Sequence, residues 1–144
     1  METPLPNLQT FIFFAGLAQI ALVLGSMAIP RILNWKTELM KVQTLIKQMF
    51  WTYAAYILVI NLSFGLLSVF AYNDLTNGSL LASTISGFIA IYWISRIVIQ
   101  FFYFDRKSFP SGLANRLAEV ILVALFLFLS IVYSMAFYYN YQQL

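Results

Sequence analysis

The sequence contains neither cysteine nor histidine, and these two absences exclude several kinds of chemistry. Without cysteine, the chain can form no disulfide, no thiolate nucleophile and no iron–sulfur cluster held by thiolates. Without either residue, it can hold neither a Cys/His zinc ion nor a haem through an axial histidine or cysteine. We therefore expect no metal site and no cofactor of these kinds.

Charge is also scarce, whereas apolar residues are abundant. Only 9% of the 144 residues are charged and 62% are hydrophobic, against about 25% charged residues in an average soluble domain. A soluble chain of this size could not cover so much apolar surface, so lipid is the expected solvent. The net charge is +3, but the eight Lys and Arg are dispersed and form no phosphate-tracking patch. We expect no nucleic-acid partner.

Four stretches are long and apolar enough to cross a bilayer, which takes about 20 predominantly apolar residues. They cover residues 8–30, 49–72, 79–104 and 113–139. This pattern predicts an all-α integral membrane protein whose four transmembrane helices form an antiparallel bundle. Residues 1–144 then form a single membrane domain.

The basic residues lie in alternate connections between these stretches. The first connection contains Arg31, Lys36, Lys41 and Lys47, and the third contains Arg106 and Lys107. The N-terminal segment, the second connection and the C-terminal segment contain no Lys or Arg. The positive-inside rule therefore predicts that both basic connections are cytoplasmic and that both termini lie outside. We expect the protein in a plasma membrane of the bacterial inner-membrane type.

Residues 34–48 are too polar to span a membrane, yet their apolar side chains recur at helical spacing. These side chains follow one another at steps of four and three, namely Trp35, Leu39, Val42 and Ile46, and the series continues to Met49 at the start of the next span. The three lysines of the segment, Lys36, Lys41 and Lys47, fall largely on the other side. The pattern predicts a short amphipathic helix at the cytoplasmic interface, with its lysines among anionic lipid headgroups. The helix would either cap the bundle as a simple extension or serve as a docking surface.

Small residues mark places where the chain turns tightly or where two helices approach closely. The Asn-Gly pair before Ser79 predicts a tight turn, and Ser79 itself is a suitable N-cap for the third span. Ala21 with Gly25, and Ser83 with Gly87, have the four-residue spacing that lets helix backbones come close together.

Each span carries polar residues on one face, and helices in lipid turn such faces inward. Gln19 and Asn61 lie near the middle of the first and second spans. We therefore predict a hydrogen bond between these two amides at the bilayer midplane.

Arg96 places a permanent charge inside the third span. Its side chain is long enough to reach toward the cytoplasmic interface, where Glu119 of the antiparallel fourth span is expected. We predict an Arg96–Glu119 ion pair, with Gln100 and Tyr103 as further partners and Trp93 on the same face. Arg116, three residues before Glu119, is a rival partner for that carboxylate. The cluster would pin two helices together, bind a polar headgroup, quinone or substrate, or pass protons.

Three classes of function are compatible with this organisation. Four spans with short loops leave no soluble domain, and no nucleophile with an adjacent base is visible. The first hypothesis is therefore a non-enzymatic accessory, assembly or scaffold subunit that associates with the bilayer, with other membrane subunits or with its own copies. The alternative is a small transporter or carrier of a lipid-like, quinone or other hydrophobic ligand that uses Arg96 and Glu119. A lipid or quinone enzyme would depend almost wholly on Glu119 for acid–base chemistry, so we expect no enzymatic activity.

Overall fold

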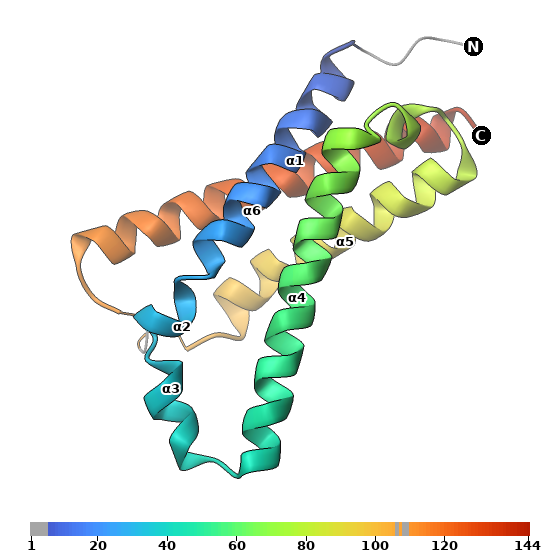
Figure 1. Ribbon diagram of the computed structural model, residues 1–144. Helices are drawn as coiled ribbons and strands as arrows, with labels where there is room; N and C mark the ends of the chain where they lie inside the picture. The colour runs from blue at the N-terminus through green and yellow to red at the C-terminus, as the bar shows by residue number, and fades with distance from the viewer. Residues whose placement is uncertain (1–5, 106, 108–109) are drawn as a thin grey trace.

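The computed structural model describes residues 6–105, 107 and 110–144, and this part of the chain forms helices and no strand (Figure 1). The long helices are α1 (Pro6–Ser26), α4 (Thr44–Phe70), α5 (Leu80–Phe102) and α6 (Leu113–Gln142). Each of these regions is long and apolar enough to cross a membrane. The all-α prediction is confirmed, and the four predicted segments form long apolar helices that fit an integral membrane protein.

The long helices pack chiefly as two pairs, α1 with α4 and α5 with α6, and α1 also contacts α6. The N-terminal half of α4 extends away from the other long helices toward α3, as Figure 1 shows. The buried residues of α4 are accordingly Asn61, Gly65 and Ser68, all in its C-terminal half. Ile12 of α1, Ile89 of α5 and the α6 residues near Leu129 form the apolar core between the pairs.

The α1–α4 pair comes into backbone contact at two glycines. A Cβ atom added to Gly16 would lie 2.8 Å from the carbonyl oxygen of Gly65. A Cβ atom added to Gly65 would lie 3.0 Å from the carbonyl oxygen of Gly16. Any larger residue at either position would therefore push the two helices apart.

The close approach predicted at Ala21 and Gly25 is wrong, because nothing lies within 4 Å of a Cβ added to Gly25. Both residues are exposed on the side of α1 opposite its buried face. Four-residue spacing identifies a smooth helix face but does not say which face is packed. In the second pair, Ser83 is buried and a Cβ added to Gly87 would lie 3.0 Å from the Phe137 ring. That contact joins a backbone to a side chain.

The connection between α1 and α4 is broken into short pieces. It contains α2 (Ile29–Ile32), α3 (Trp35–Glu38) and the 3₁₀ turn η1 (Leu39–Lys41), and α4 begins at Thr44. The single helix predicted over residues 34–48 is therefore wrong. Val42 and Gln43 have extended backbones, with ψ of 161° and 149°, which reverse the chain between α3 and α4.

Aromatic side chains pack against one another across this reversal of the chain. The Trp35 ring meets the Phe50 ring edge-on at 4.7 Å and the Trp51 ring at 5.5 Å, measured between ring centroids. The apolar periodicity of the segment therefore serves a contact between α3 and the first turns of α4. It does not form one continuous helical face.

The connection between α4 and α5 contains the 3₁₀ turn η2 (Asp74–Thr76) and is hydrogen-bonded to α1, through Gln9 and Thr76, and to α6. The predicted N-cap is confirmed, since the Ser79 hydroxyl accepts a hydrogen bond from the Ala82 N–H at 3.1 Å. Gly78 adopts φ +73°, which favours glycine. Buried Asn140 of α6 donates to the Leu75 carbonyl at 2.7 Å and accepts from the Gly78 N–H at 3.0 Å.

We expect Asn140→Leu to loosen this connection selectively. The change leaves the Leu75 carbonyl and the Gly78 N–H without their partner, at a cost of about 1–3 kcal/mol. Amide hydrogen exchange over residues 71–79, followed by mass spectrometry, should become about tenfold faster or more. Asn73→Leu is the control, because Asn73 is exposed and its side chain makes no capping bond. Equal exchange in the two variants would contradict the role of Asn140.

Candidate functional site

Each of the four long helices contributes one buried side chain to a hydrogen-bonded cluster. These side chains are Gln19 of α1, Ser68 of α4, Trp93 of α5 and Tyr133 of α6, and we refer to them as the polar node. Gln19 Nε2 donates to the Tyr133 hydroxyl at 2.6 Å, and Trp93 Nε1 donates to Gln19 Oε1 at 3.2 Å. The Ser68 hydroxyl bonds the same tyrosine oxygen.

The hydrogen-bonding groups of the node are matched within the chain. The Gln19 amide also donates to the Ala15 carbonyl at 3.3 Å, so both of its polar ends are occupied. The Trp93 ring is stacked on Phe126, with centroids 5.5 Å apart. An amide, an indole, a phenol and an alcohol without a neighbouring base do not make a reactive constellation. The arrangement fixes four helices relative to one another.

The hydrogen bond predicted between Gln19 and Asn61 is not formed, because other partners occupy the Gln19 amide. Gln19 lies level with Gly65, since a Cβ added to that glycine would be 3.3 Å from Gln19 Cβ. Asn61 is one turn away and lies beside Tyr92. Its Oδ1 atom is buried and has no hydrogen-bond partner within the described part of the chain. The depth of the two amides within their spans therefore predicts the register of the α1–α4 pair wrongly by about one turn.

Arg96 lies between two aromatic rings. Its Cζ atom is 5.4 Å from the centroid of the Phe126 ring and 5.9 Å from that of Phe104. Of these rings, Phe126 is buried in α6 and Phe104 follows the end of α5. The side chain therefore extends toward the end of α5, and the rings stabilise its charge through cation–π contacts.

The predicted Arg96–Glu119 ion pair is absent, although the structure describes both residues. The reason is the relative length of the two helices. With 30 residues against 23 in α5, α6 begins well beyond the end of its partner. Arg96 is thus level with Phe126, about two turns deeper along α6 than Glu119.

The other residues predicted around Arg96 lie in different surroundings. Tyr103 is 82% exposed and its ring contacts Phe104, so it is not a partner of the guanidinium. Trp93 belongs to the polar node. Gln100 is half-buried and follows Arg96 by one turn on α5, so the two residues share one face of the helix.

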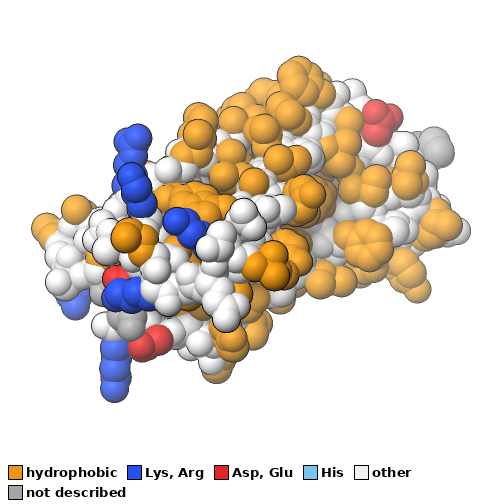
Figure 2. All heavy atoms as spheres, turned by 60° about the horizontal axis from the view of Figure 1, so that its bottom comes forward, with side chains coloured by type: hydrophobic (Ala, Val, Ile, Leu, Met, Phe, Trp, Pro, Cys, Tyr) orange, Lys and Arg blue, Asp and Glu red, His pale blue; other side chains and the backbone are white. Residues whose placement is uncertain are grey.

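The lysines of the first connection are at the molecular surface. Lys36 and Lys41 are exposed, Lys47 is half-buried on α4, and Lys41 forms an ion pair with Glu38 at 3.3 Å. Figure 2 shows Lys and Arg side chains gathered at one end of the molecule and none toward the opposite end. Arg106 of the third connection lies outside the described residues.

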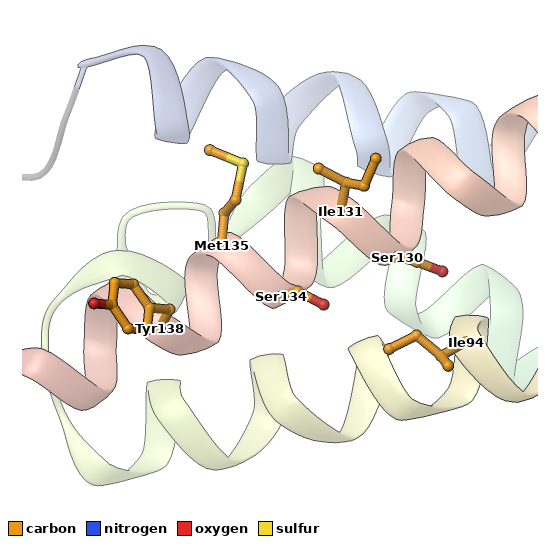
Figure 3. A pocket seen from close by; sticks show the side chains of 6 residues that line it. All are labelled: Ile94, Ser130, Ile131, Ser134, Met135 and Tyr138. Carbon is orange, nitrogen blue, oxygen red and sulfur yellow. The ribbon is translucent and has the colours of Figure 1, made fainter.

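An open groove of about 480 Å³ lies on the outer face of α5 and α6 (Figure 3). It is lined by Ile94, Ser130, Ile131, Ser134, Met135 and Tyr138. The Ser130 hydroxyl is already bonded to the Phe126 carbonyl at 2.7 Å. An apolar groove with so few available polar groups does not provide the convergent contacts that a polar substrate needs.

No cluster of three or more acidic, histidine or cysteine side chains that could hold a metal ion occurs in the part of the chain that the structure describes. Comparisons of the chain with protein-family models, with curated proteins and with solved structures found no match.

Proposed function

We propose that this chain is a non-enzymatic accessory subunit of a larger membrane complex. Its four long helices form an antiparallel bundle in a plasma membrane, with the basic connections in the cytoplasm and both termini outside. The cytoplasmic half of α4 packs against a helix of another membrane protein. The gathering of Lys and Arg at one end of the molecule (Figure 2) supports this orientation.

The observation that carries the proposal is the exposure of α4 over residues 44–60. Apart from Lys47, Ala54 and Leu58, which are half-buried, every side chain in this range is exposed. The segment is about 25 Å long, close to the thickness of a hydrocarbon core. Because so few side chains of this segment pack against the rest of the chain, its surface is available to a partner helix.

Two tyrosines favour a protein partner over lipid alone on this surface. Tyr53 and Tyr56 are about 60% exposed and lie one turn apart on the same side of α4. A tyrosine hydroxyl within hydrocarbon needs a hydrogen-bond partner, which lipid tails do not offer. A neighbouring helix can supply that partner.

A carrier that uses Arg96 and Glu119 together is the weaker proposal. The two side chains form no ion pair in the described structure, and Arg96 lies level with Phe126, about two turns from Glu119 along α6. We therefore do not assign a transported ligand to this pair.

Photo-crosslinking in the native membrane tests the proposed subunit role. With p-benzoylphenylalanine in place of Tyr56, we expect a discrete protein adduct of defined mass, because the partner helix covers this position. The control places the same amino acid at Phe88 of α5, which is 66% exposed on another helix. Adducts with lipid only at both positions would contradict a partner on α4. An adduct of twice the mass of the chain would identify the partner as a second copy.

A further inference from the structure

The structure also points to a lipid site at Arg96, on grounds independent of the proposed subunit role. The guanidinium carries five N–H donors, and aromatic rings attract its charge without accepting conventional hydrogen bonds. No described side chain or carbonyl accepts a hydrogen bond from Arg96, and no described carboxylate pairs with it. A guanidinium in low dielectric without an anion is costly, so this arrangement favours an anionic ligand.

The surroundings of Arg96 have further unused hydrogen-bonding capacity. Tyr92 lies one turn deeper on α5, within electrostatic reach of Arg96 and beside Asn61. The Asn61 side chain is only 8% exposed, and its Oδ1 atom is unpartnered. Gln100 is half-buried one turn toward the end of α5. A guanidinium, a phenol and an amide along one side of α5 are donors suited to the oxygens of a phosphate.

The position of the site favours an amphiphile over a free anion. The contact with Phe104 places the guanidinium toward the end of α5, where headgroups are expected. Phe104, whose ring contacts the guanidinium, is itself 38% exposed and gives an acyl chain an apolar surface beside the charge. The Lys and Arg gathered at this end of the molecule attract anionic lipids to it (Figure 2).

We propose that Arg96 binds the phosphate of an anionic membrane lipid, with Gln100 and the exposed Phe104 ring beside it. The site selects a net negative headgroup, because one guanidinium neutralises one phosphate charge. A zwitterionic lipid keeps its own cation near the phosphate and gains less from Arg96.

Native mass spectrometry of the full chain in detergent tests the site with phosphatidylglycerol and phosphatidylcholine. We expect the first phosphatidylglycerol molecule to bind about tenfold more tightly than phosphatidylcholine, the size of one charge-assisted contact. Arg96→Gln should bring the two affinities to within about twofold of each other. Arg31→Gln, which removes an exposed arginine of α2, should leave the preference intact. Equal affinities in the wild-type protein, or an equal loss in both variants, would overturn the proposal.

Two further measurements keep the test decisive if Arg96→Gln does not fold. Arg96→Lys retains the charge but not the bidentate fork, and should weaken phosphatidylglycerol binding several-fold. A photoactivatable phosphatidylglycerol should label peptides that contain residues 92–104, and label confined to other helices would overturn the site. Excess inorganic phosphate should leave the lipid bound. Displacement by phosphate would assign the site to a free anion and overturn the lipid proposal.

Discussion

Gly16→Leu is expected to destabilise the protein by about 3 kcal/mol, at the upper end of the usual cost of overpacking. A Cβ at Gly16 would lie 2.8 Å from both the Gly65 carbonyl oxygen and a Val69 methyl, and 2.9 Å from Ser68 Cβ. A backbone carbonyl cannot move aside as the end of a flexible side chain can. The two helices must separate, and Ser68 then leaves the polar node. The free energy of unfolding, measured by titration with sodium dodecyl sulfate in mixed micelles, checks this result.

Gly25→Leu is the matched control for this experiment. It makes the same change on the same helix, at a position where an added Cβ meets nothing within 4 Å. Leucine is also the better helix former, by up to about 1 kcal/mol. We therefore expect Gly25→Leu to leave stability unchanged or to raise it slightly. Equal losses in the two variants would show that the backbone contact at Gly16 and Gly65 does not hold α1 and α4 together.

Gln19→Leu is expected to lower the free energy of unfolding by about 2–3 kcal/mol. The change removes the bonds to Trp93 and Tyr133, each worth roughly 0.6–1.7 kcal/mol in a membrane protein, and leaves the indole N–H unpaired. The same detergent titration measures the loss. Gln48→Leu is the control, because this glutamine is exposed near the start of α4.

A double-mutant cycle with Tyr133→Phe isolates the central bond of the node. Once the tyrosine hydroxyl is gone, Gln19→Leu should cost about 1 kcal/mol less than in the wild-type protein. Additive effects would mean that the 2.6 Å contact contributes nothing to stability. A Gln19→Leu variant as stable as Gln48→Leu would contradict the node as a whole.

The predictable parts of this structure are those that depend on one helix at a time. A run of about 20 apolar residues gives the four long helices, and the Ser79 hydroxyl gives the start of α5. The inward polar faces were also predictable, because Gln19, Ser68 and Tyr133 lie on the polar sides of their spans. These features follow from local sequence and from the cost of polar groups in hydrocarbon.

The pairing between helices could not be predicted, because it depends on register. Depth within the spans predicts that Gln19 meets Asn61, but the contact at Gly16 and Gly65 places Gln19 level with Gly65, about one turn further along α4. The predicted Arg96–Glu119 pair requires α5 and α6 to end together, whereas α6 is seven residues longer. Helical spacing predicts that Trp93 shares a face with Arg96, but it does not predict the partner of Trp93 on the next helix.

Helical periodicity misled in one further place. The apolar spacing of residues 34–48 continues across Val42 and Gln43, where the chain reverses. The spacing of apolar residues indicates which side chains share a surface in the folded chain. Here that surface includes the contact between Trp35 and Phe50 across a turn. A single sequence does not distinguish that arrangement from one straight helix.

The distribution of the polar node among four helices has a consequence for the order in which the protein is made. Gln19, Ser68 and Trp93 are synthesised before Tyr133, whose hydroxyl joins two of them. A nascent chain that has inserted three helices therefore holds buried amide and alcohol groups without their shared partner. Unsatisfied polar groups are costly in hydrocarbon, so the arrival of the fourth helix, which supplies the Tyr133 hydroxyl, stabilises the helices made before it.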